Sequence, residues 1–183
     1  MPLTTRPVVV GVQARFFRDG AAFTVPSAGT AGRAALPGVA DTGWIDLGVI
    51  NEGTINTESD VIEIFAPQPG RKVLHDIIQT KNKLTINLTL QELSPLAFEL
   101  VFKTAALTGS STTYNPLSLM DKKGWLELKL ADQGDTVVTV SHFFVYLKTG
   151  GEWSLGDGLA SVPLEAHVLA SSLDAGSVGP VPE

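Results

Sequence analysis

The chain contains no cysteine, so neither a disulfide framework nor a thiolate metal site can be built from it. Histidine is nearly as scarce, and His75, His142 and His167 do not have a recognisable zinc spacing. No apolar run approaches the roughly 18 residues of a membrane span, and the first residues lack the apolar core of a secretory signal. We therefore expect synthesis in the cytoplasm, with no metal and no cofactor.

Charge is also sparse, at 17% of residues, with a net charge of −6. An acidic chain gains no affinity by releasing counterions from phosphates, which argues against sequence-specific DNA binding. Hydrophobic residues make up 44% of the chain, and the mean hydropathy of +0.19 is high for a free soluble monomer. This balance favours a protein that reserves apolar surface for its neighbours.

Sequence motifs for catalysis are weak throughout. Ser154 in Gly151–Gly156 has the wrong spacing for a nucleophile elbow, and Gly70-Arg71-Lys72 lacks the rest of a phosphate loop. His75 is followed by Asp76, but adjacent residues of an extended segment point to opposite faces and make a poor dyad. No acid–base pair emerges, and we do not expect an enzyme.

Period-2 alternation of apolar and polar residues dominates the chain and predicts a mainly β protein. The clearest strand is Leu84–Leu90, whose leucine and isoleucine side chains share one face. Similar patterns occur at 125–130, 136–148 and 160–170. Further strands are expected at 8–17, 22–25, 45–50 and 61–65, and 132–135 suits a hairpin loop.

Two of these strands carry polar faces with hydroxyl and amide groups but no charge. Such faces suit a wet lumen or a stacked subunit better than a free exterior. We therefore expect them to form a lumen or stacking surface. The residues are Thr85, Asn87, Thr89, Thr139 and Ser141.

A single helix is expected after Ser94, a good N-cap, with Pro95 at its first position and Gly109 near its end. One face carries Phe98, Val101, Phe102 and Ala105, and the other side carries the charged residues Glu99 and Lys103. A second apolar strip flanks those charges. A helix with apolar residues on two sides should be covered on both. We therefore expect another subunit to cover the second strip, which consists of Leu96, Leu100 and Leu107.

The remaining segments are rich in Gly, Ala and Pro and are expected to be irregular parts of one domain spanning 1–183. Two Pro residues argue against a strand in 66–72, where Arg71 and Lys72 would either meet acidic residues of a neighbouring copy or lie in a solvated turn. The others are an N-terminal arm at 1–7, a long loop at 26–43 and a C-terminal tail at 171–183.

The order of features across roughly 8–170 resembles that of the tail tube (major tail) proteins of long-tailed bacteriophages. The resemblance rests on segments with the expected order of polar and apolar residues and not on a diagnostic motif. The segments are Phe16–Gly20, Trp44–Ile50, Ile55–Ile64, Leu84–Leu93 leading into Ser94-Pro95, and Trp153–Leu169.

This resemblance implies an antiparallel β-sandwich or barrel with one flanking α-helix. In that family, subunits form hexameric rings whose sheets merge into one inner barrel, and the rings stack into a hollow tube through which DNA passes. The partners would be copies of the chain and other tail proteins, and the location the virion. A lumen wall that does not retain DNA should be neutral or acidic.

Two alternatives remain open. Trp44, Trp125 and Trp153 are expected to be packing anchors, but they could form an aromatic platform for carbohydrate on a soluble β-sandwich. The second alternative is a related virion part, such as a tail terminator or the tube of a contractile injection machine, because the architecture is shared.

Overall fold

A computed structural model describes residues 9–91, 94–101, 122–132, 137–151 and 161–173. The described part is mainly β with one helix, which confirms the predicted fold class. The elements are β1 (Val9–Arg18), β2 (Ala22–Phe23), β3 (Gly29–Thr30), β4 (Ile45–Asp46), β5 (Ile50–Gln68), β6 (Arg71–Leu90), α1 (Pro95–Val101), β7 (Lys122–Asp132), β8 (Val137–Thr149) and β9 (Val162–Val168).

Seven strands form one antiparallel sheet in the order β4-β1-β7-β8-β9-β6-β5. The described strands do not close into a barrel, because β4 and β5 remain as edges. The sheet is nevertheless curled, because its edge strand β5 comes close to β1 near the opposite edge. A Cβ atom added to Gly53 of β5 would lie 3.9 Å from the side chain of Val12 of β1. The predicted strands at 84–90 and 125–130 lie within β6 and β7, and those at 136–148 and 160–170 overlap β8 and β9 with slightly different ends.

The sheet has two buried faces of unequal size. One face, here called the helix face, packs on α1 and holds the main core, which includes Phe16, Leu88 and Leu126. The opposite face, here called the lobe face, carries a smaller aromatic cluster around Phe17 and Trp125. Successive residues alternate between these two cores because side chains of a strand point to opposite faces.

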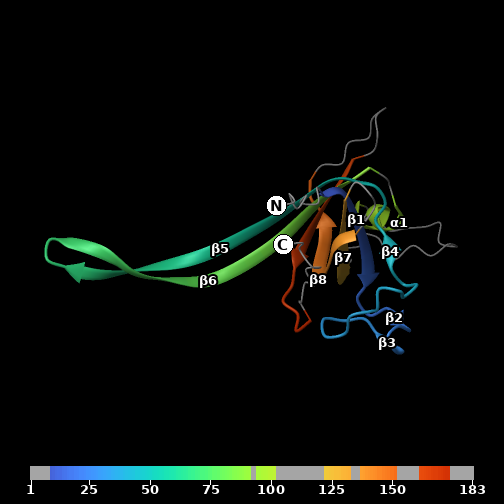
Figure 1. The fold of residues 1–183 in the computed structure, drawn as a ribbon, viewed down its shortest axis with the longest axis horizontal. Coiled ribbons are helices and arrows are strands. Elements are labelled where there is room, and N and C mark those ends of the chain that lie inside the picture. The colour runs from blue at the N-terminus through green and yellow to red at the C-terminus, as the bar shows by residue number, and fades with distance from the viewer. Residues whose placement is uncertain (1–8, 92–93, 102–121, 133–136, 152–160, 174–183) are drawn as a thin grey trace, which may run out of the picture.

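Residues 19–47, here called the lobe, include β2 and β3 at the lower end of the sheet in Figure 1, and Phe23 and Ala31 of the lobe belong to that aromatic cluster. The loop predicted at 26–43 is only partly irregular, because it contains β3 and a bridge between Gly32 and Ala35. The Asp41 carboxylate accepts hydrogen bonds from the backbone of Thr24 at 2.7 Å and of Gly43 at 2.9 Å. Side-chain to backbone bonding therefore replaces the regular ladder that this segment lacks.

The first turn of α1 is as predicted. The Ser94 hydroxyl accepts a hydrogen bond from the Ala97 amide at 3.2 Å, and Pro95 is the first helical residue. Glu99, expected on a charged outer side, is fully buried and lies 2.7 Å from Arg18 and 3.2 Å from Lys122. These ion pairs tie the helix to β1 and β7.

The most prominent element outside the body is the long hairpin of β5 and β6, which projects far from it (Figure 1). The prediction of a loop at 66–72 is wrong, because β5 continues to Gln68 and β6 begins at Arg71. The turn is Pro69-Gly70, and Gly70 has φ of 77°, a backbone conformation that glycine adopts without strain. Pro67 is tolerated because β5 is an edge strand.

Candidate assembly surface

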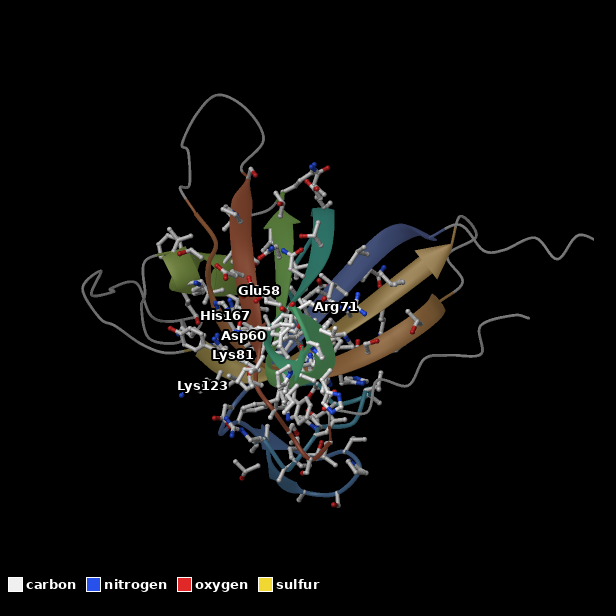
Figure 2. All side chains as sticks on the ribbon, turned by 90° about the vertical axis from the view of Figure 1, so that its left-hand side faces the viewer. Glu58, Asp60, Arg71, Lys81, Lys123 and His167 are labelled. Carbon is white, nitrogen blue, oxygen red and sulfur yellow. The ribbon has the colours of Figure 1, made fainter. Side chains whose placement is uncertain are left out.

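The hairpin leaves the body where its pairing with β9 ends, at Thr85 of β6. Beyond that residue β6 pairs only with β5, so among the described strands nothing covers either outer edge. We call residues 54–87 the extended hairpin, with a proximal part (54–60 and 81–87) and a distal part (61–79). Figure 2 looks along it and labels Glu58, Asp60 and Lys81 on the proximal part and Arg71 near the tip.

The distal part exposes large apolar side chains on both of its faces. Alternation along β5 assigns these residues to faces, and the cross-strand register places their β6 partners on the same side. Val61, Phe65, Leu74 and Ile77 lie on the continuation of the helix face; Ile62, Ile64 and Ile78 lie on the continuation of the lobe face. Their exposed fractions run from 38% to 55%.

The proximal part is polar on its lobe face. Thr54 and Asn56 are exposed there, and their β6 partners are Asn87 and Thr85. Two ion pairs follow in the same row: Lys83 lies 3.2 Å from Glu58 and Lys81 lies 3.4 Å from Asp60. The acids and bases of this strip balance each other, so it presents hydrogen-bonding groups and no net charge.

A β-bulge separates the two parts. Asp60 pairs with Lys81 and Val61 pairs with Gln79, so Thr80 is an extra residue of β6, and its hydroxyl donates a hydrogen bond to the Asp60 carbonyl at 3.1 Å. A second irregularity lies between Ile64 and Phe65. Bulges increase local twist and bend the strand, so the change from polar to apolar coincides with a change in direction.

The predicted polar surface is divided by the sheet register. Thr85, Asn87 and Thr89 lie on the lobe face, but Ser141 pairs with Leu128 and Thr139 with Leu130, which places both on the helix face. These residues therefore form two separate polar faces and not one continuous surface, and a role of either face in a lumen or in stacking stays a prediction. Thr85 is also mostly buried, with 7% exposed.

The expected interface on the helix is also corrected. Leu96 is fully buried and Leu100 is 5% exposed, both within the chain's own core, so they are not available to a neighbouring subunit. Leu107 lies outside the described residues. Arg71 and Lys72 are exposed at the tip of the extended hairpin, where they remain candidates for contact with a neighbour.

A buried ion cluster fastens the lobe to the sheet. The Glu127 carboxylate accepts hydrogen bonds from Arg15 at 2.8 and 2.9 Å, and Nε2 of His142 lies 3.1 Å from it. Arg15 also stacks on the Trp44 ring and donates to the Val39 carbonyl at 3.2 Å.

The pKa of Glu127 reflects two opposing effects. Burial alone would raise it, but hydrogen bonds from His142, Arg15 and Lys129 outweigh burial and lower the pKa from its ordinary value of 4.5 to about 2. The carboxylate is therefore ionised at neutral pH, and its contacts have a structural role in holding the lobe against the sheet.

One arrangement superficially resembles a catalytic triad. The Thr85 hydroxyl lies 3.4 Å from Nδ1 of His167, and Nε2 of His167 lies 3.0 Å from Glu165. Thr85 and His167 are direct cross-strand partners, so their proximity follows from the ladder, and Thr85 is mostly buried. Lys148 lies 3.0 Å from Glu165 as well. Among the described residues, no three acidic or histidine side chains converge as a metal site would require.

The extended hairpin is the feature that reasoning from the sequence missed. Its signal was present as two apolar runs, 61–65 and 73–78, on either side of a Pro-Gly turn. The second run was not recognised as a strand because Leu74-His75-Asp76 interrupts its alternation. The bulge at His75 explains that interruption.

Comparisons with known proteins give little further information. No protein-family model matches the chain, and no curated protein matches it. A search of solved structures found similarity to a chain in a cryo-EM structure of the anti-feeding prophage (AFP) baseplate, 6-fold symmetrised. The two are 13% identical, with 92% of this chain and 95% of that chain covered and a TM-score of 0.45. In the described part of this chain, no helix is long and apolar enough to cross a membrane.

Proposed function

We propose that the protein is a structural subunit of a phage-type tail, which assembles with copies of itself into stacked rings that form a hollow tube. The observation that carries this proposal is the extended hairpin, with its apolar side chains uncovered on both faces. An isolated two-stranded hairpin is marginally stable in water, so its stable partner is another molecule.

The shape of the surface favours rings over a two-fold dimer. The hairpin projects from one side of the body (Figure 1), and its residues 54–87 carry no net charge, whereas the rest of the chain carries −6. A contact between two different surfaces repeats from copy to copy until it closes as a ring or continues as a helix. The resemblance to tail tube proteins favours the closed form with six subunits in each ring.

The polar strip of the proximal hairpin suits a channel wall. Thr54, Asn56 and Asn87 offer hydrogen bonds, while Glu58 and Asp60 compensate the adjacent lysines. A wall without net positive charge does not gain affinity from counterion release, so passing DNA would not be retained. In this proposal Thr85 and Thr89 belong to the same face, and Thr139 and Ser141 do not.

Assembly is tested by concentration-dependent light scattering and negative-stain microscopy of the purified full chain. We expect rings or hollow tubes, in a reaction that weakens when apolar contact is lost. A chain that stays monodisperse and monomeric at its highest soluble concentration would contradict the proposal. Neighbouring rings joined end to end would indicate a tube subunit, whereas single rings that never stack would favour the terminator alternative.

The carbohydrate alternative finds less support. Trp125 is fully buried, as expected for a packing anchor, and Trp44 packs edge-to-face on Phe17 at 5.4 Å with Arg15 over its ring. Trp153 lies outside the described residues. A platform for sugars needs exposed rings, so the same sample should not be retained on immobilised glycans.

A further inference from the structure

The two parts of the extended hairpin differ in how many of their faces expose apolar side chains to solvent. The proximal part has an apolar helix face, with Ile55 and Leu84, and a polar lobe face. The distal part exposes large apolar side chains on both faces, with one carboxylate among them on each face, Glu63 and Asp76. We propose, resting on the assembly described above, that the distal part is inserted between two layers of other copies, while the proximal part is covered on one face only.

The exposed apolar area is large enough for such an insertion. Exposed fractions of 38–55% on the distal residues correspond to an area on the order of 600 Å², most of what one partner brings to a standard interface of ~800 Å² a side. Since the area is divided between two faces, a single flat partner would cover only about half of it.

The reach of the hairpin fits a second copy of the chain. From Lys72 to Leu84, β6 extends for roughly 40 Å at ~3.3 Å per residue. A compact body of about 150 residues is ~40 Å across. The hairpin can therefore run across one neighbouring copy and meet the copy beyond it.

Charge also favours contact between hairpin and body. Residues 54–87 contain Glu58, Asp60, Glu63 and Asp76 against Arg71, Lys72, Lys81 and Lys83, so their net charge is zero and the remaining residues carry the whole −6. Two acidic bodies repel each other, whereas a neutral hairpin with a basic tip does not. A lipid or an unrelated acidic partner is the competing occupant, and the experiment below separates them.

The absence of cysteine makes a direct test possible with single-cysteine variants. Glu63→Cys reports on the helix-face side of the distal part, and Asp76→Cys reports on the lobe-face side. Both positions are exposed in the single chain. We expect assembly to slow the reaction of a soluble maleimide at both positions by at least tenfold. Asn56→Cys, on the polar proximal face, is the matched control and should change less than twofold.

The outcomes separate this inference from the proposed function. If the protein assembles but only one of Glu63→Cys and Asp76→Cys is protected, or neither is, two-sided insertion is wrong while assembly stands. If the wild-type chain never assembles in buffer, the proposed function fails; protection appearing only with anionic lipid vesicles would assign the surface to a membrane and overturn the inference as well.

Paired threonine substitutions give an independent readout that keeps the β-branched shape. Val61→Thr with Ile77→Thr changes the helix-face side, and Ile62→Thr with Ile78→Thr changes the lobe-face side. Each pair should raise the concentration needed for assembly by more than tenfold if both faces are buried. An unchanged threshold for either pair, with normal circular dichroism, would contradict the inference. Thr54→Ser is the control.

Discussion

The lobe and the extended hairpin are both insertions into the same sheet, yet they solve the problem of burial in opposite ways. The lobe folds back, and the Trp125 indole donates hydrogen bonds to the Gly32 and Ala35 carbonyls at 2.8 and 3.0 Å. Ser171 donates to the Arg33 carbonyl from the far end of the chain. The hairpin instead has regular pairing but leaves its apolar side chains outside.

Regular secondary structure and burial are thus separate properties in this protein. The lobe has little regular structure, but its contacts to the sheet are numerous and specific. The hairpin has a ladder along its whole length and no tertiary contact beyond its base within the described residues. The lobe should therefore govern the stability of the single chain, and the hairpin should govern its association.

The largest effect on stability is expected from Trp125→Ala. This substitution removes a fully buried ring, its edge-to-face contact with Phe144 at 5.4 Å and both hydrogen bonds to the lobe. We expect a loss of about 3–5 kcal/mol in the free energy of unfolding, measured with urea. Trp125→Phe keeps most of the ring and should cost about 1–2 kcal/mol for the lost N–H donor. Equal losses from the two variants would show that the hydrogen bonds, not the packing, fasten the lobe.

The next largest effect is a fall in the unfolding free energy at low pH, which should come mainly from carboxylates on the lobe face of the sheet and in the lobe. Because the folded pKa of Glu127 is lowered from 4.5 to about 2, its contribution is complete above pH 4.5 and is lost as the pH falls toward 2. The loss amounts to about 3 kcal/mol, and Glu127→Gln should flatten the slope of unfolding free energy in that window. Asp41, whose pKa is lowered by hydrogen bonds from Gly43 and Thr24, acts in the same direction, so some slope should remain. An unaltered slope in Glu127→Gln would contradict this assignment.

The smallest effect on the single chain is expected from shortening the hairpin. Asp60 and Lys81 are cross-strand partners, so residues 61–80 can be replaced by Asn-Gly, a favoured two-residue turn. The unfolding free energy should change by less than about 1 kcal/mol, because among the described residues the deleted strands pair with each other, and Thr80 adds only a hydrogen bond to the adjoining Asp60. Assembly, followed by light scattering, should be abolished. A loss of stability above about 2 kcal/mol would mean that the hairpin belongs to the body's core.

Which elements form could be read from local patterns, since alternation and capping depend on neighbouring residues only. Leu84–Leu90 and Ser94-Pro95 behave as their sequence predicts. The prediction of a loop at 66–72 failed because proline disfavours a strand in the middle of a sheet. The sequence does not reveal that β5 lies at an edge, where the missing N–H of proline breaks no hydrogen bond of the ladder.

Composition and alternation alone establish that the protein lacks cysteine and predict a mainly β fold with a helix capped by Ser94, as the described residues show, together with apolar surface reserved for neighbours. The location of the exposed apolar side chains depends on how the strands and the helix pack: Leu96 and Leu100 are inside, and the distal hairpin is outside. The pairing of the strands likewise places Thr85 and Ser141 on opposite faces. The reason is physical: alternation fixes the faces within one strand, but the register between strands joins those faces into surfaces.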